Sequence, residues 1–101
     1  RFKKEYQLIL REYERTQNAR LFLEELSNIR HKPKTDFNKA AYYFSMSTAL
    51  HKNGRTEEAL DHLDKIRTTE QVMREMVNQQ RLVLERELEN KENHMAQKSE
   101  I

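Results

Sequence analysis

Histidines and carboxylates are the residues of this chain that could bind a metal or transfer protons. No two of the histidines lie three or four positions apart, and none has carboxylates at the spacing of a recognised metal motif. The chain has no cysteine, no glycine-rich loop and no serine motif on a tight turn. Its Asp and Glu residues lie among Lys and Arg rather than in apolar surroundings. We therefore expect no enzyme, no metal and no cofactor; the histidines are His31, His51, His62 and His94.

The composition indicates one small all-α domain. Charged residues make up 36% of the 101 residues, and glycine and proline occur once each, so breakers of helices are rare. We expect a single interaction or oligomerisation domain over residues 1–101, cut from a larger protein because the chain begins at Arg1. No apolar run approaches the roughly 20 residues of a membrane span. The expected location is intracellular, in the cytoplasm or the nucleus.

Apolar residues at steps of three and four predict four helices. The first and last are long, and two short helices joined by a tight turn lie between them. The expected ranges are 1–31, 36–52, 56–67 and 69–95. Pro33 separates the first two, and Gly54 can adopt the left-handed conformation that ends the second. Caps are expected from Thr35 or Asp36, from Thr56, and from Thr68 or Thr69.

The two middle helices carry a characteristic order of side-chain sizes. Large, medium, small and large residues precede the glycine, and a small residue followed by a bulky one comes after it: Tyr43, Met46, Ser47, Leu50, Gly54, Ala59 and Leu63. Residues 40–67 thereby resemble a tetratricopeptide (TPR) helical hairpin. The resemblance implies a docking surface for other proteins, with the small residues allowing close helix packing. An ordinary helical hairpin with small residues at its contact is the alternative.

The resemblance covers only part of the chain and has departures. Ile66 stands where the family prefers alanine, and a shift of 34 residues in either direction finds no second repeat. Because repeats stack to bury their faces, a single hairpin must be covered by other helices. We expect the first and last helices to provide that cover, in a four-helix bundle or helical array.

Two surfaces are predicted to bind partners. On residues 36–52, the stripe opposite the core would receive a peptide or helix of another protein, with Phe44 as an aromatic anchor if it is not buried. Coiled-coil-like seams on the two long helices would allow the chain to form a homo-oligomer. The first surface comprises Ala41, Phe44, Thr48 and His51, and the seams comprise Tyr6, Ile9, Tyr13, Met73, Val77, Leu84 and Leu88.

Charge is distributed unevenly along the chain. The net charge of +2 divides into +4 over residues 1–35, zero over the middle and −2 over residues 68–101. Opposite charges at the two ends could attract each other within a chain or between chains. A basic first helix could alternatively bind nucleic acid, calmodulin or a membrane surface, although interspersed glutamates dilute its positive charge. The favoured function is protein–protein interaction, as a scaffold or adaptor.

Overall fold

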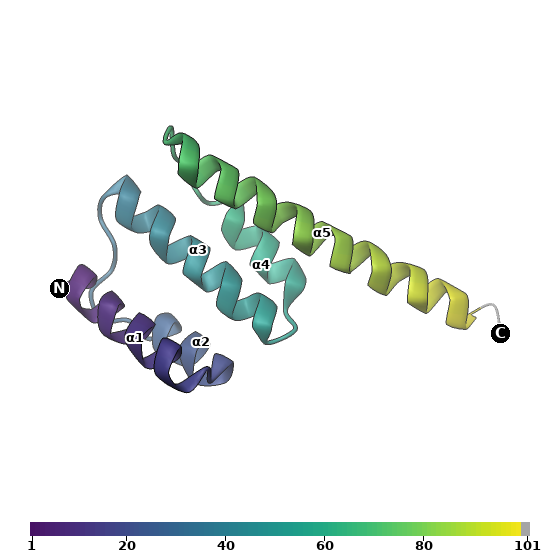
Figure 1. Cartoon of the computed structure of the whole chain (residues 1–101), viewed down its shortest axis with the longest axis horizontal. Helices are drawn as coiled ribbons and strands as arrows, with labels where there is room; N and C mark the ends of the chain where they lie inside the picture. Colours follow the sequence, from purple (N-terminus) through teal and green to yellow (C-terminus); the bar gives the residue numbers. More distant parts are fainter. Residues whose placement is uncertain (100–101) are drawn as a thin grey trace.

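The computed structural model describes residues 1–99, with side chains for residues 1–92. Within this range the chain is all-helical, as predicted, and it contains five helices rather than four. Figure 1 shows them as α1 (Phe2–Thr16), α2 (Ala19–Ser27), α3 (Asp36–Lys52), α4 (Thr56–Leu63) and α5 (Gln71–Ser99).

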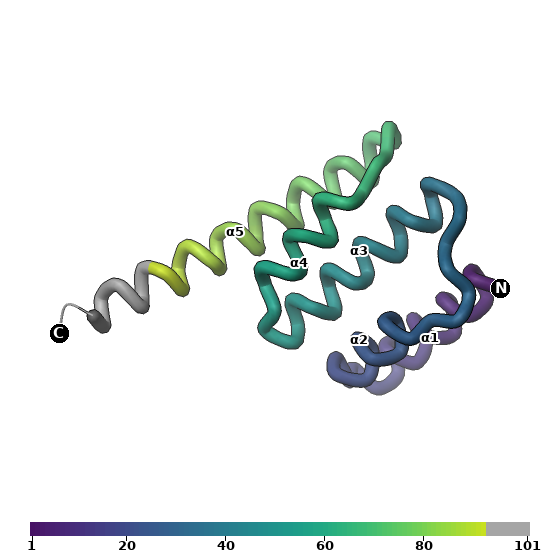
Figure 2. The backbone as a smooth tube through the Cα atoms, turned by 180° about the vertical axis from the view of Figure 1, so that it is seen from behind, coloured from purple at the N-terminus to yellow at the C-terminus, as the bar shows by residue number. Residues whose placement is uncertain are grey.

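The helices form a two-layer array in which each packs against the next along the chain. Helices α1, α3 and α5 lie in one layer, and α2 and α4 lie behind them (Figures 1 and 2). Helix α3 is central and is the helix with the most buried residues in the described chain. The two ends of the array are α1 and α5, which lie on opposite sides of the α3–α4 hairpin (Figures 1 and 2).

The prediction of one continuous helix over residues 1–31 was wrong. Gln17 adopts a left-handed conformation with φ of 54° and ends α1. Asn18 then caps α2, because its side-chain oxygen accepts a hydrogen bond from the Leu21 N–H at 3.0 Å. In a straight helix Phe22 would lie about 13 Å further along the axis than Tyr13. The break instead lets the two rings stack, with their centroids 4.2 Å apart.

The helix bounds of the middle hairpin follow local signals closely. Helix α3 occupies the predicted range, and its cap is Thr35, whose hydroxyl accepts from the Asn38 N–H at 3.1 Å. Gly54 has the expected positive φ, at 77°. Helix α4 ends at Leu63 rather than residue 67, because Lys65 and Ile66 bond to carbonyls only three residues back and tighten the chain into a turn.

Two of the predicted caps were wrong. Arg55 occupies the N-cap position of α4 and offers no side-chain acceptor, and Thr56 is already the first helical residue. At α5, the Thr68 hydroxyl accepts from the Glu70 N–H at 3.1 Å and makes a turn before the helix. The Arg74 N–H then bonds the Glu70 carbonyl. A hydroxyl placed three residues before the helical start stabilises that turn rather than the first helical N–H groups.

The core runs through the whole array. Among its most deeply buried residues are Leu26, Leu63 and Leu84, from α2, α4 and α5. Polar bonds then fix the N-terminal hairpin to α3. The Tyr6 hydroxyl donates to the Ala41 carbonyl at 3.2 Å, and the Tyr42 hydroxyl donates to the Leu26 carbonyl at 2.9 Å. Burial raises the pKa of both tyrosines, so both hydroxyls are neutral donors near neutral pH.

The carboxylate of Glu5 ties α1 to the chain that leaves α2. It accepts from the backbone N–H groups of Arg30 and His31 at 2.9 and 3.1 Å, and it lies 3.0 Å from the His31 ring. Because these bonds favour the ionised carboxylate, above all the two backbone bonds, the pKa of Glu5 falls from 4.5 to about 2. This contact fixes the first turns of α1 to the segment that follows α2.

Replacing Glu5 is expected to produce a stability loss that depends on pH. A lowered pKa in the folded state stabilises the protein above the unfolded value, and that stabilisation disappears as pH falls through the folded value. The difference in melting temperature between the wild type and Glu5→Gln should therefore be constant above pH 4.5 and shrink toward pH 2. Thermal melts from pH 2 to 7 test this. A difference that persists unchanged at the lowest pH would contradict the assignment of the lowered pKa.

Candidate interaction face

Four neighbouring helices contact different sides of α3. The Ser45 hydroxyl lies 2.5 Å from the Tyr6 hydroxyl on α1. The Asn53 side chain, at the end of α3, donates to the Ala19 carbonyl on α2 at 3.0 Å. Tyr43 and Ser47, which are one turn apart, lie on the side that packs on α4, where the rings of Tyr43 and His62 are 6.3 Å apart. Nε2 of His51 lies 2.7 Å from a carboxylate oxygen of Glu87 on α5. One side of α3, between α1 and α5, has no helix over it.

The predicted stripe of α3 lies on this uncovered side. Ala41, Phe44, Thr48 and His51 are all half-buried. The sequence left open whether Phe44 is exposed, and the structure places it against the core with part of its ring accessible. The Thr48 hydroxyl bonds the Phe44 carbonyl within the helix at 3.2 Å. The stripe is thus a partly accessible surface with two apolar side chains, Ala41 and Phe44, and two polar ones, Thr48 and His51.

Sequence reasoning missed Phe37, which is the most exposed member of this surface. It extends the stripe by one turn, since positions 37, 41, 44, 48 and 51 follow steps of four and three along one helix face. The Phe37 side chain is 65% exposed. The sequence shows that Phe37 lies four positions before Ala41, but Phe37 is in the first turn of the helix and was left out of the predicted stripe.

Helix α5 contributes a second apolar stripe on the same side. Glu87, which contacts His51, marks the side of α5 that borders α3. Val83, Met76 and Val72 lie 4, 11 and 15 residues before Glu87, so they lie along that side of the helix. They are 47%, 45% and 62% exposed. We call the two stripes together the α3–α5 face: Phe37, Ala41, Phe44, Thr48, His51, Val72, Met76, Val83 and Glu87.

The predicted self-association seams lie elsewhere. Ile9, Val77 and Leu84 are buried inside the chain itself. Three other members are half-buried against the same core: Tyr6, Tyr13 and Met73. Leu88 is half-buried and lines a hollow with the start of α4. These side chains are turned toward other helices of the array. Any contact with a second molecule along α5 must therefore use a different side of that helix.

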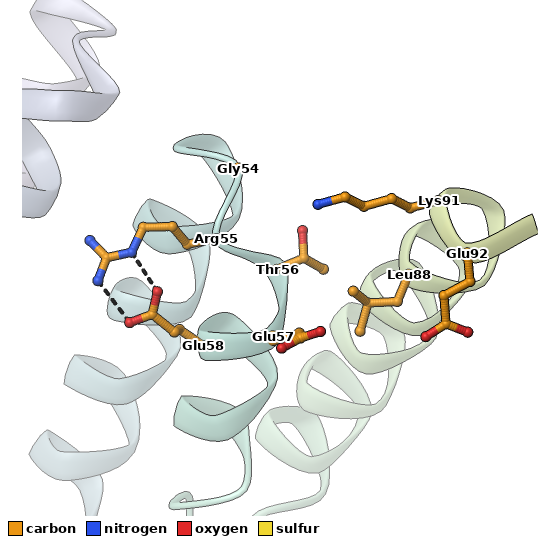
Figure 3. Close-up of a pocket in the computed structure, with 8 residues that line it drawn as sticks. All are labelled: Gly54, Arg55, Thr56, Glu57, Glu58, Leu88, Lys91 and Glu92. Atoms are coloured by element: carbon orange, nitrogen blue, oxygen red, sulfur yellow. Dashed lines mark hydrogen bonds and ion pairs between the residues drawn. The ribbon is translucent and has the colours of Figure 1, made fainter. Parts of the chain in front are cut away.

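A hollow lies between the start of α4 and α5. Figure 3 shows Gly54–Glu58 on one wall and Leu88, Lys91 and Glu92 on the other. Arg55 donates two hydrogen bonds to Glu58, at 2.6 and 2.7 Å. The pairing raises the pKa of Arg55 and lowers that of Glu58. The hollow is open and has charges of both signs, so it presents no single electrostatic preference to a ligand.

Within residues 1–92, no three His, Asp or Glu side chains gather to hold a metal ion. The side chains with shifted pKa values take part in structural bonds, as Glu5 and the Arg55–Glu58 pair do.

No helix of the described chain is long and apolar enough to cross a bilayer. Compared with protein-family models, with curated proteins and with solved structures, the chain matches none of them.

Proposed function

We propose that the chain is a protein–protein interaction domain that acts as a scaffold or adaptor. The partner segment lies on the α3–α5 face. The observation that carries this proposal is the exposure of Phe37, Met76 and Val83 on the sides of α3 and α5 that carry the His51–Glu87 contact, in a chain that is 36% charged. Contiguous exposed apolar side chains are typical of docking surfaces, and aromatic residues are favoured anchors there.

The TPR-like character of the middle hairpin supports the proposal. Ser47 and Ala59 are both fully buried, so they permit a close approach of α3 and α4. Gly54 provides the left-handed turn between these helices. Helical arrays of this kind bind partners on the surface formed by one layer of helices. The α3–α5 face lies on that layer.

The N-terminal hairpin adds a second argument. Gln17 and Gly54, 37 positions apart, both have positive φ between two helices. With that offset, buried Phe22 and Leu26 occupy the positions of Ala59 and Leu63. Leu10 and Phe22 depart from the pattern of sizes, since they stand where the middle hairpin has the small Ser47 and Ala59. A shift of the sequence against itself by 34 residues does not align these two turns, so it finds no repeat before residue 36.

The shape of the face suggests the kind of segment it binds. The stripe from Phe37 to His51 spans 14 residues, or about 21 Å along the helix axis. Its middle is apolar, and the His51–Glu87 pair forms one polar end. An amphipathic helix of about four turns would cover this length with its apolar side. The partner is therefore proposed to be such a segment.

Adjacent residues of α5 provide a sharp test. Val83 belongs to the α3–α5 face, whereas Leu82 is displaced by about 100° around the helix and is also exposed, at 61%. Peptides selected from a displayed library of amphipathic helices against the immobilised chain are the probe. Val83→Glu should weaken their binding by at least about tenfold, since a charge would be buried under the peptide. Leu82→Glu should leave it unchanged.

The two variants also define the contrary result. Equal binding by the wild type and Val83→Glu, with helix content unchanged by circular dichroism, would remove the α3–α5 face from consideration. Recovery of no binding peptide from the library would also contradict the proposal. Phe37→Ala provides an independent check, because it shortens an exposed side chain on the other helix of the face.

A further inference from the structure

The outer side of α1 carries a basic stripe with a leucine at its centre. Positions 1, 4, 8, 11 and 15 follow steps of three and four, so they share one side of the helix. All five side chains are exposed, and Leu8 is exposed to 58%. The opposite side of α1 holds Phe2 and Ile9 in the core. The α1 stripe consists of Arg1, Lys4, Leu8, Arg11 and Arg15.

The outer side of α5 carries a stripe with the same spacing and the opposite charge. Its positions 75, 78, 82, 85 and 89 repeat the steps of the α1 stripe, again with an exposed leucine in the centre. Leu82 is 61% exposed, and the four polar members are also exposed. Val77 and Leu84 bury the opposite side of this helix. The α5 stripe consists of Glu75, Asn78, Leu82, Glu85 and Glu89.

The two stripes cannot meet within one molecule. Helices α1 and α5 are the opposite ends of the array, with α3 and α4 between them (Figures 1 and 2). Each stripe lies opposite the buried residues of its own helix, so both are directed away from the molecule. Their complementary charges can be satisfied only between molecules.

We propose that copies of this chain associate end to end, with the α1 stripe of one copy on the α5 stripe of the next. Leu8 packs on Leu82, which sets the register and excludes water at the centre. With these leucines opposed, three cations of α1 face glutamates of α5 in either helix direction, because both stripes are nearly symmetric about their leucines. A contact between two different surfaces is heterologous, so it builds rings or open chains.

The charged side chains of both stripes can leave their contacts within the chain with little loss of stability. Arg15 bonds Glu12 at 2.8 Å, and Gln71 bonds Glu75 at 3.2 Å. Both contacts are exposed and join residues three or four positions apart, a type of contact that contributes little and exchanges readily. The proposed interface therefore replaces weak local contacts with contacts that an apolar centre protects from water.

A second copy explains the α1 stripe better than a nucleic acid does. Phosphate binding requires concentrated positive charge and has no use for an exposed leucine among the cations. The net charge of the chain is only +2, and the matching acidic stripe lies on the same molecule. This contact uses neither Phe37 nor Val83, so it goes beyond the proposed function and is independent of the α3–α5 face.

Charge reversal tests the contact without relying on one variant. Arg11→Glu with Arg15→Glu removes the net positive charge of the α1 stripe, and Glu85→Arg with Glu89→Arg changes the α5 stripe from net negative to net positive. Each pair should weaken self-association at least about tenfold. Light scattering over a micromolar to millimolar series measures it as the average mass relative to 12.3 kDa.

Three controls make the result specific. Mixing the two reversed pairs should restore assembly, because each supplies the stripe that the other lacks. Glu24→Arg with Asp61→Arg changes the net charge as much as the α5 reversal does but lies outside both stripes, so it should have no effect. Leu82→Glu should weaken association while Val83→Glu does not, the reverse of the result expected for peptide binding.

The contrary outcomes are equally definite. A wild-type chain that stays at 12.3 kDa at every concentration would overturn the proposal. So would association that survives either reversal, or that a mixture of the two folded reversed variants fails to restore. A monomer that binds a short oligonucleotide through Arg11 and Arg15 would assign the α1 stripe to nucleic acid instead.

Discussion

Replacing Leu84 by alanine is expected to lower the free energy of unfolding by about 2–5 kcal/mol. Leu84 is fully buried and belongs to the core that joins α5 to the rest of the array. Its removal leaves a cavity in addition to the lost transfer free energy. For a domain of this size each kcal/mol shifts the melting temperature by about 4–8 °C. Urea unfolding of the two proteins measures the loss.

Leu82→Ala is the matched control for this prediction. It makes the same chemical change on the same helix, but the side chain is 61% exposed, so its effect should lie within about 0.5 kcal/mol. Similar losses at both positions would show that α5 does not pack with this side inward. The contrast also matters for interface studies, because substitutions at Leu84 would damage the fold rather than report on self-association.

Replacing Ser47 by leucine is expected to cost about 1–3 kcal/mol through overpacking. Ser47 is fully buried on the side of α3 that packs on α4. Three additional carbon atoms must push the two helices apart or force neighbouring side chains out of their rotamers. Thermal melting of the two proteins would reveal the loss. An unchanged melting temperature would contradict the close approach of α3 and α4 at this position.

Ser47→Ala separates the effect of size from that of polarity. The Ser47 hydroxyl is the buried side-chain group of the described residues that makes no hydrogen bond. Because a buried hydroxyl without a partner is destabilising, its removal should be neutral or raise the free energy of unfolding by up to about 1 kcal/mol. A loss comparable to that of Ser47→Leu would mean that the hydroxyl has a partner in solution.

The sequence alone determined the features that depend on local chemistry. The scarcity of glycine and proline predicted an all-helical chain. Thr35 and Gly54 marked the two ends of α3 because a cap oxygen and a left-handed turn act on their own helix, with no need of distant residues. The small residues Ser47 and Ala59 were correctly identified as buried, since their size has a purpose only at a close helix contact.

Tertiary packing decided the two features that the sequence could not. Helix α1 ends at Gln17, a residue with no special tendency to adopt positive φ, because the turn lets Tyr13 stack on Phe22. On α5, both Val77 and Val83 are valines in apolar stripes, yet one is 8% and the other 47% exposed. Helical periodicity identifies such stripes but does not say which one its neighbours will cover. That choice belongs to the array as a whole, and it determines where a partner can bind.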